Sequence, residues 1–197
     1  MNFLAHLLLS GANDEIRIGN FIADSVKGSD LSKFSATVQT GILLHRKIDH
    51  YTDNHPVVMK SKVRLRPQFH KYSPVIVDVF YDHFLAKNWN NYASQPLEEF
   101  IACAYKLLSD NFELIPGRTQ MMLPYMIKDN WLLHYREIEG IRRALTGMAR
   151  RSKFESKMEY ATISLEKNYK QFQEEFETFF PELITKAEQW TEELMNR

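Results

Sequence analysis

The sequence predicts an all-α protein that forms a single-domain helical bundle over residues 1–197. Apolar residues recur every three or four positions in most segments, as one face of an amphipathic helix requires. No stretch alternates apolar and polar residues with a period of two, the pattern of a half-buried strand. A chain of 197 residues is long enough to bury a substantial core within one domain.

The bulk composition is typical of a soluble globular protein, with 44% hydrophobic and 25% charged residues. The formal net charge is zero, which argues against a general nucleic-acid binder. No apolar run approaches the roughly 20 residues that a membrane-spanning helix needs. The single cysteine, Cys103, has no partner for an internal disulfide and fits a reducing compartment. We therefore expect a cytoplasmic protein that binds neither nucleic acid nor membrane.

Turn residues divide the first half of the chain into five expected helices. Gly28 ends the second of them, and the third ends before Pro56, because the residue preceding a proline disfavours the helical conformation. Pro74 lies near the start of the fifth helix, where proline is tolerated. The five segments are Met1–Ser10, Ile16–Gly28, the stretch from Ser35 to Asn54, Val57–Tyr72, and the stretch from Pro74 to about Trp89.

The second half contains further amphipathic segments. Pro116 and Gly117 separate the first of these from a stretch rich in methionine and aromatic residues. The last segment has the clearest apolar periodicity in the chain, and Pro181 is expected to interrupt or kink it. The expected segments are Pro96–Leu114, Gln120–Trp131, Glu137–Met148 and Leu165–Leu194.

The third expected helix carries a polar ladder. His45, Asp49 and Asp53 are four residues apart, so their side chains project from one side of the helix. Two interpretations stay open for this spacing. The ladder either contributes to a metal site or forms a solvated face on which Arg46 and Lys47 pair with neighbouring acids, a common and weak arrangement.

Other acids and imidazoles lie within apolar segments. Asp78 and Asp82 repeat the four-residue spacing, with His83 beside them. Asp24 interrupts an apolar pattern, and its alternative is a capping or surface role. His6 is surrounded by leucines and is either a metal ligand or a core histidine hydrogen-bonded to a carbonyl. Burying such groups without partners costs several kcal/mol, which a divalent cation would offset.

Carboxylates, imidazoles and water are the ligands that hard divalent cations prefer. A bound cation acidifies water and neutralises phosphoryl charge, so such a site suits phosphoester hydrolysis. Arg46 beside the ladder either holds a phosphate with its planar guanidinium or pairs with Asp49 or Asp53. The chain lacks the motifs of phosphate-binding loops, dinucleotide sites and serine nucleophiles.

Six segments, in this order, resemble the bacterial acyl carrier protein phosphodiesterases, which release 4′-phosphopantetheine from holo-acyl carrier protein. They are MNFLAH (Met1–His6), GNFIADSVKG (Gly19–Gly28), GILLHRKIDHYTDNHP (Gly41–Pro56), VDVFYDHFLAKNW (Val77–Trp89), WLLHYREI (Trp131–Ile138) and LTGMARR (Leu145–Arg151). The resemblance implies an all-α fold similar to the HD-type metal phosphohydrolases. It also implies a divalent cofactor, Mn²⁺ or alternatively Mg²⁺, and attack of activated water on the diester.

The resemblance guides the assignment of site residues. The adjacent pair Asp82-His83 is reversed relative to the His-Asp pair of HD enzymes, so the metal ligands are inferred and not read from a motif. We expect an inner metal shell of His6, Asp24, Asp82 and His83. Catalytic support, as orientation, proton transfer or phosphate binding, is expected from His45, Arg46, Asp49 and Asp53.

Carrier proteins of this kind are small and acidic, which draws attention to two basic segments. Lys60–Lys71 and Arg142–Lys153 each contain five cationic residues and no acid. They are candidate docking surfaces for acyl carrier protein, although a charge run is also typical of a solvated face. Two other functions remain open: an HD-type hydrolase acting on a nucleotide, and a non-catalytic helical module that binds an acidic partner.

Overall fold

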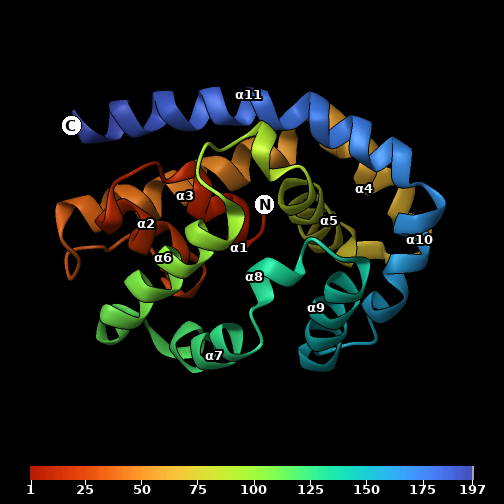
Figure 1. The fold of residues 1–197 in the computed structure, drawn as a ribbon, viewed down its shortest axis with the longest axis horizontal. Coiled ribbons are helices and arrows are strands. Elements are labelled where there is room, and N and C mark those ends of the chain that lie inside the picture. Colours follow the sequence, from red (N-terminus) through yellow and green to blue (C-terminus); the bar gives the residue numbers. More distant parts are fainter. Residues whose placement is uncertain (197) are drawn as a thin grey trace.

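The computed structural model describes residues 1–196, which form eleven α-helices joined by short 3₁₀ turns and contain no β-strand (Figure 1). The all-α prediction is therefore confirmed. The helices are α1 (Phe3–Leu9), α2 (Asp14–Ile22), α3 (Ala36–Asn54), α4 (Pro56–Phe69), α5 (Ser73–Lys87), α6 (Leu97–Asp110), α7 (Gly117–Lys128), α8 (Trp131–His134), α9 (Ile138–Arg151), α10 (Ala161–Lys167) and α11 (Tyr169–Met195).

Local capping explains where the early helices begin. The Asn13 side chain accepts a hydrogen bond from the backbone of Ile16 at the start of α2, and Ser35 accepts one from Val38 at the start of α3. Such caps satisfy amide groups that have no partner within the helix. Pro56 occupies the first position of α4, where its missing N–H costs nothing. The two helices that carry most of the candidate site thus have defined starting points.

Helix α5 lies near the centre of the molecule and is buried on most of its circumference. Helix α11 runs along one side of the bundle and packs against α3, α4 and α5 (Figure 1). Aromatic side chains fill this interface. Tyr81 of α5 lies edge-on to Phe176 of α11, and Phe80 lies edge-on to Phe172. Edge-on aromatic pairs are favoured over face-to-face stacks and bury large apolar areas, so α11 stabilises the helices from which the site is built.

Helices α2 and α3 cross at very short distance. A Cβ atom on Gly19 would lie 2.1 Å from the carbonyl oxygen of Val38, and a Cβ atom on Gly41 would lie 2.1 Å from that of Ile16. No side chain larger than hydrogen fits at either position without movement of the backbone. The crossing therefore sets the separation between the side chains that follow Gly19 on α2 and those that follow Gly41 on α3.

Some predicted boundaries differ from the structure. The second helix ends at Ile22 and not at Gly28, because a 3₁₀ turn over Ala23–Ser25 follows it. Asp24 therefore lies on this turn, where a poor helix former is readily accepted. The last helix begins at Tyr169 and continues through Pro181, so of the two predicted effects of this proline the interruption is wrong and a kink stays a prediction. Pro181 is exposed, and water can bind the carbonyl that loses its helical hydrogen bond.

The methionine-rich stretch Gln120–Trp131 also divides differently from the prediction. It belongs to α7, which ends at Lys128, and Trp131 begins the separate short helix α8. Asn130 between them has a positive φ angle of 43°, which turns the chain. None of the described helices is both long and apolar enough to cross a membrane.

Candidate metal and active site

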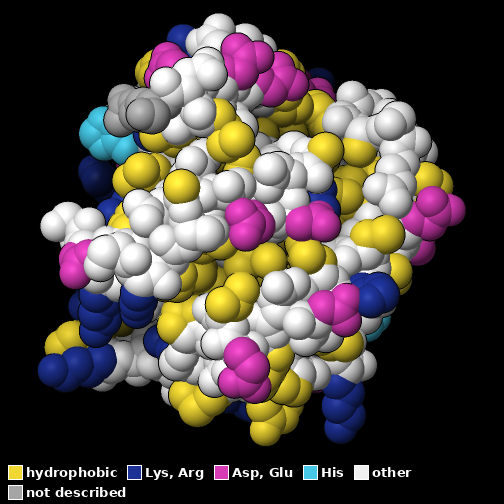
Figure 2. All heavy atoms as spheres, turned by 90° about the vertical axis from the view of Figure 1, so that its left-hand side faces the viewer, with side chains coloured by type: hydrophobic (Ala, Val, Ile, Leu, Met, Phe, Trp, Pro, Cys, Tyr) yellow, Lys and Arg dark blue, Asp and Glu magenta, His cyan; other side chains and the backbone are white. Residues whose placement is uncertain are grey.

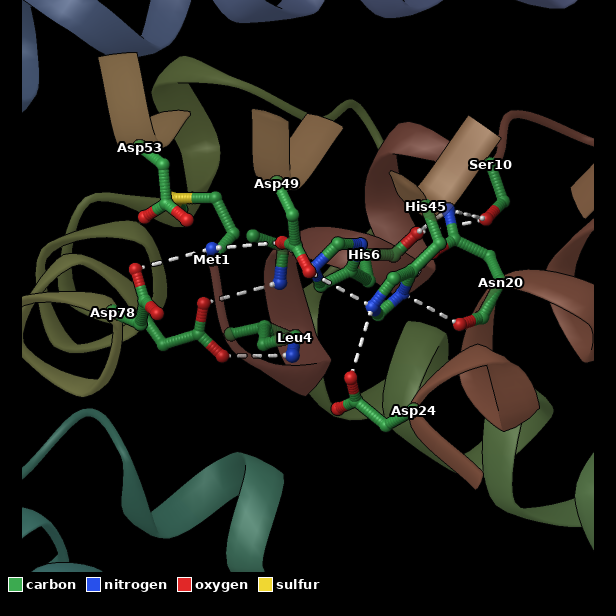
Figure 3. A network of polar contacts seen from close by, with 12 residues as sticks. Met1, Leu4, His6, Ser10, Asn20, Asp24, His45, Asp49, Asp53 and Asp78 are labelled. Carbon is green, nitrogen blue, oxygen red and sulfur yellow. Dashed lines mark hydrogen bonds and ion pairs between the residues drawn. The ribbon is translucent and has the colours of Figure 1, made fainter. Parts of the chain in front are cut away.

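Two imidazoles and a carboxylate converge where α1 meets α3 (Figure 3). Asp49 Oδ1 lies 3.1 Å from His6 Nε2, and Asp49 Oδ2 lies 3.0 Å from His45 Nε2. The two imidazole rings are stacked with their centroids 3.9 Å apart. One ligand atom from each of the three residues lies within 4.8 Å of the other two. This arrangement fits a divalent cation held by mixed imidazole and carboxylate ligands.

Asp24 adds a second carboxylate at the edge of the cluster. Its Oδ1 atom lies 3.3 Å from His45 Nε2, so both carboxylates face the same nitrogen of His45. Both imidazole side chains are at least 90% buried, whereas the Asp24 side chain is 70% exposed and that of Asp49 is 39% exposed. The cluster therefore opens to solvent at Asp24, and a substrate or water would enter from that side.

Asn20 fixes the orientation of His45. His45 Nδ1 lies 2.9 Å from the backbone oxygen of Asn20 and 3.0 Å from its side-chain oxygen, so this nitrogen carries a proton and donates. Nε2 is then the nitrogen directed at the two carboxylates. The Asn20 amide donates to the His6 carbonyl and to Ser10 Oγ. A histidine whose second ring nitrogen donates to an oxygen is typical of metal ligands, so the donor set fits a resident cation.

Charges within the cluster are strongly perturbed. Burial and the neighbouring His45 lower the pKa of His6 to about 4, so the His6 ring is neutral at pH 7. Burial acts to lower the pKa of His45, but hydrogen bonds with Asp24 and Asp49 outweigh it and raise this pKa to about 9. Burial opposes ionisation of Asp49, yet hydrogen bonds from both imidazoles hold its pKa well below the usual range. The site thus keeps an ionised carboxylate at its centre.

A second carboxylate, that of Asp78, is linked to Asp49 by the α-amino group of Met1. The α-amino group of Met1 is 3.4 Å from Asp49 Oδ1 and 3.1 Å from Asp78 Oδ1. Burial acts to lower the pKa of this amine, but the charges of Asp78 and Asp49 outweigh it and raise the pKa to about 10. The ammonium group therefore balances two carboxylates that lie on different helices, as Figure 3 shows.

The structure separates Asp82 and His83 from this cluster. The Asp82 carboxylate accepts hydrogen bonds from the backbone N–H groups of Leu4 and Ala5 at 2.8 and 3.3 Å, and it therefore caps the start of α1. His83 Nδ1 lies 2.8 Å from the Tyr135 carbonyl, and Nε2 lies 2.8 Å from the Tyr169 hydroxyl. Asp82 and His83, two of the four residues expected in the inner metal shell, thus have protein partners elsewhere.

Asp53 and Arg46 also point away from the imidazoles. Asp53 accepts a 2.7 Å hydrogen bond from Lys62, one turn beyond Asp49 on α3. The Arg46 guanidinium donates to the backbone oxygens of Gly28 at 2.8 Å and Val26 at 3.4 Å. It pairs with neither Asp49 nor Asp53, the alternative considered from the sequence. Of the expected site residues, the structure brings together His6, Asp24, His45 and Asp49.

Two participants were missed by reasoning from the sequence, Asn20 and the amine of Met1, whereas Asp78 was noted there as a possible ligand without a specific role. Asn20 follows Gly19 in the segment GNFIADS and is fully buried. A buried asparagine beside a glycine within an apolar pattern was the available signal, because such an amide needs several partners.

Comparison with known proteins supports the motif resemblance. The sequence model of the acyl carrier protein phosphodiesterase family matches residues 1–183. The chain belongs to this family. Relatives described as acyl carrier protein phosphodiesterase include those of Photorhabdus laumondii, 33% identical over 95% of this chain and 96% of the relative, and of Enterobacter sp. (strain 638), 34% identical over 95% and 97%.

The relative from Yersinia pestis carries the same description and is 31% identical over 95% of this chain and 98% of its own length. The matches therefore extend over nearly the whole of both chains, and the resemblance to acyl carrier protein phosphodiesterases is confirmed. The search of solved structures gives no match. The expected similarity to the fold of HD-type phosphohydrolases stays a prediction.

Proposed function

We propose that this protein hydrolyses the phosphodiester that joins 4′-phosphopantetheine to a serine of holo-acyl carrier protein. Water adds to phosphorus, the bond from phosphorus to the serine oxygen breaks, and the serine oxygen takes up a proton. The products are apo-acyl carrier protein and 4′-phosphopantetheine. The observation that carries this proposal is the solvent-open cluster of His6, His45, Asp49 and Asp24 in a member of this family.

His6, His45 and Asp49 would hold a divalent cation, with Asp24 as a further carboxylate ligand or as a base at the open edge. When bound, the cation lowers the pKa of water toward about 7 and neutralises charge on a phosphoryl oxygen. Mn²⁺ is the preferred candidate and Mg²⁺ the alternative, because both accept carboxylate and imidazole ligands. The buried Asn20 contacts hold His45 in the orientation that this role requires.

Other residues position this set. Arg46 ties the loop after Asp24 to α3 through the carbonyls of Val26 and Gly28, so we assign it to holding Asp24 in place and not to binding phosphate. Asp82 orders the start of α1 and thereby the helix that carries His6. The ion pair between Asp53 and Lys62 joins α3 to α4 and would support the helix that carries His45.

Docking of an acidic carrier protein needs unpaired cations near the site. Several cations of the two basic segments are already engaged: Lys62 by Asp53, Arg64 by Glu175, and both Arg142 and Arg143 by Glu139. The ends of the two segments meet at Phe154, which is 57% exposed. Lys71 Nζ lies 4.1 Å and Lys153 Nζ lies 5.6 Å from the centre of its ring.

We name Lys71, Lys153 and Phe154 the Phe154 patch. Neither lysine lies within 4 Å of a carboxylate in residues 1–196, so both charges are available to a partner. Phe154 lies three residues beyond Arg151, the last residue of α9. We assign the Phe154 patch as a docking surface for acidic side chains of the carrier protein.

Purified protein incubated with Mn²⁺ and holo-acyl carrier protein tests the proposal. Mass spectrometry should detect loss of the prosthetic group, and elemental analysis should detect bound metal. Asp49→Asn should lose both, whereas Asp14→Asn, at an exposed carboxylate of α2 outside the cluster, should keep both. Hydrolysis of nucleotides without release of 4′-phosphopantetheine would contradict the proposal, and absence of metal uptake and turnover would favour a non-catalytic module.

A further inference from the structure

Two adjoining cavities extend from the open edge of the metal cluster. The larger has a volume of about 640 Å³ and is bordered by Asp24 and Ser25 of the 3₁₀ turn and by residues of α7, α8 and α9. The smaller has a volume of about 340 Å³ and lies between α8 and α9. Their shared walls join them into one groove, lined in both parts by Phe3, Met122, Asp129, Trp131, Met148 and Arg151.

The groove is attached directly to the site. Ser25, the residue after Asp24, has its hydroxyl 2.5 Å from that of Thr119 on α7. Figure 3 shows Asp24 on the far side of the cluster from Asp78, separated from the buried ammonium group. The larger cavity therefore begins at the open edge of the cluster, and the smaller cavity continues from it between α8 and α9.

The walls of the groove are largely apolar. Trp131 and Met148 face both cavities, and the inner cavity reaches the small residues Ala144 and Gly147 of α9. At the outer rim, Met121 and Tyr125 of α7 are 68% and 65% exposed. Exposed apolar side chains are visible at the lower edge of Figure 2, at the level where α7 lies in Figure 1. An elongated ligand with apolar and amide groups fits such walls.

In the described part of the chain, the two arginines of the larger cavity have no acidic partner, whereas Arg143 of the smaller cavity pairs with Glu139. Arg118 of α7 and Arg151 of α9 both line the larger cavity, and neither lies within 4 Å of a carboxylate among residues 1–196. Burial, and then the charge of Arg118, lower the pKa of Arg151. Two guanidinium groups that face one cavity and repel each other are stabilised by an anion between them, and phosphate suits their planar geometry.

Asp129 is the acid common to both cavities. Its carboxylate accepts hydrogen bonds only, so it suits hydroxyl and amide N–H groups and disfavours a second anion. The larger cavity, which Asp24 borders, thus carries Arg118 and Arg151, and the smaller cavity is mainly apolar, with Asp129 as its acid and with His134 and Arg143 also in its wall. A ligand with one phosphate, followed by an extended chain of hydroxyl and amide groups, matches this order.

We propose that this groove binds the phosphopantetheine arm of the carrier protein, with Arg118 and Arg151 on the phosphate and Trp131, Met148 and Ala144 along the pantetheine chain. The assignment rests on the proposed function and adds to it the residues that recognise the prosthetic group. It identifies the arm, in addition to the surface of the carrier protein, as a determinant of substrate choice. Arg118 and Arg151 are binding residues outside the metal cluster.

Free 4′-phosphopantetheine is the probe for this proposal, because it contains the arm without the carrier protein. Its addition to the Mn²⁺-loaded protein should change the fluorescence of Trp131, and Trp131→Phe should abolish most of this change. Arg118→Gln and Arg151→Gln should each weaken binding at least tenfold, and Arg151→Lys should recover part of it. Arg142 lies on α9, as Arg151 does, but outside both cavities. Arg142→Gln is therefore the matched control and should bind 4′-phosphopantetheine normally.

Ala144→Phe tests the inner part of the groove. The added ring should weaken binding of 4′-phosphopantetheine at least tenfold, and it should impair hydrolysis of holo-carrier protein more than hydrolysis of a small aryl phosphodiester, which is too short to reach the inner cavity. Circular dichroism melts must show that each variant is folded. An equal loss of 4′-phosphopantetheine binding and of small-diester hydrolysis would overturn the assignment of the inner cavity.

The two proposals fail in different ways. If holo-carrier protein is not hydrolysed but 4′-phosphopantetheine binds and the arginine variants lose it, the proposed function is wrong and the groove stands. If hydrolysis occurs while both arginine variants and Ala144→Phe keep normal binding and an unchanged KM, the groove assignment is wrong and the proposed function stands.

Discussion

His45 shows how single residues determine the chemistry of this site. Its Nδ1 proton is held by Asn20, and its Nε2 atom faces Asp24 and Asp49. Ring orientation, proton position and electrostatic environment are thus set by three neighbours from three different elements. The four-residue spacing of His45 and Asp49 predicts only the contact between these two residues.

Asn20→Ala should lower the affinity for Mn²⁺ by roughly tenfold, because His45 loses one of the two oxygens that orient its ring and keeps only the backbone oxygen of residue 20. Isothermal titration with Mn²⁺ measures this change. Ser10→Ala is the control, since it removes a partner of the Asn20 amide but leaves the contact with His45 intact. Equal affinities of wild type and Asn20→Ala would exclude an orienting role.

Asp82 provides a prediction on pH. Burial raises its pKa to about 7, although two backbone N–H groups favour the ionised form. Between about pH 4 and pH 7 the carboxyl is protonated in the native state and ionised in the unfolded chain. Because the native state binds the additional proton, this residue makes the free energy of unfolding fall as pH rises through that window.

Relative to Asp82→Asn, which cannot ionise, the wild-type protein should therefore lose stability between pH 4 and pH 7, by at most about 1.4 kcal/mol per pH unit. Below pH 4 and above pH 7 the difference between the two proteins should be constant. Urea denaturation at a series of pH values measures it. A difference that does not vary with pH would show that Asp82 is ionised throughout.

At the scale of elements, the crossing of α2 and α3 has the largest influence on the site. It joins the helix that carries Asn20 to the helix that carries His45 and Asp49, and the 3₁₀ turn with Asp24 follows α2 directly. The contact depends on two glycines, because a Cβ atom on Gly19 would lie 3.0 Å from the α-carbon of Gly41, and one on Gly41 would lie 2.9 Å from that of Gly19. Packing of α1 then adds His6 to the same point.

Gly41→Ala should destabilise the protein by roughly 1–3 kcal/mol, because the new methyl group would overlap the Ile16 carbonyl and force the helices apart. Helix propensity alone predicts a gain of about 1 kcal/mol from the same substitution. Gly147→Ala is the matched control: its Cβ would approach only the Arg151 side chain, at 3.4 Å, so propensity should dominate there. Thermal denaturation distinguishes a loss of stability from a gain. A Gly41→Ala variant more stable than the wild type would contradict the packing argument.

Periodicity was sufficient to predict the helices, because most of them bury one apolar face. It also correctly placed His45 and Asp49 on a common face, since a four-residue spacing has that consequence in any helix. It was not sufficient for Asp53, which is one turn further along and meets Lys62 of α4. Which neighbour a polar residue meets depends on how helices cross, and the periodicity of one helix contains no information about that.

The same limit of sequence periodicity applies to Asp24, which joins the cluster, and to His83, which does not. Asp24 was placed within a helix, but the chain leaves α2 two residues earlier and presents the carboxylate to His45. His83 was grouped with the cluster because it neighbours Asp82, yet adjacent helical residues point in directions about 100° apart. Its ring instead contacts Tyr135 and Tyr169, which lie more than 50 residues further along the chain.

At the scale of the whole molecule, charge is distributed unevenly around the groove. The Phe154 patch lies just beyond Arg151, which lines both cavities, so the docking surface and the phosphate-binding end of the groove follow each other in the chain. An acidic protein therefore has reason to approach one side preferentially.

Lys71→Glu combined with Lys153→Glu should raise the KM for holo-acyl carrier protein roughly fivefold or more and leave the KM for a small diester unchanged. The wild-type KM for carrier protein should also rise with salt, since exposed charges are screened within about 10 Å at 0.1 M. Steady-state kinetics with both substrates measures these effects. Lys186→Glu, an exposed lysine of α11, is the control. Equal changes for both substrates would argue against docking at the Phe154 patch.

Helix α1 has only seven residues, a length at which an isolated helix does not persist in water. It is stabilised by burial of its apolar side chains, by hydrogen bonds from its first amide groups to Asp82, and by the contact of His6 with Asp49. Formation of α1 and uptake of a cation are therefore thermodynamically linked. At a free cation concentration 100 times the dissociation constant, this linkage would add about 2.7 kcal/mol to the stability of the native state. The supply of metal would then determine how long the folded enzyme survives as well as how fast it works.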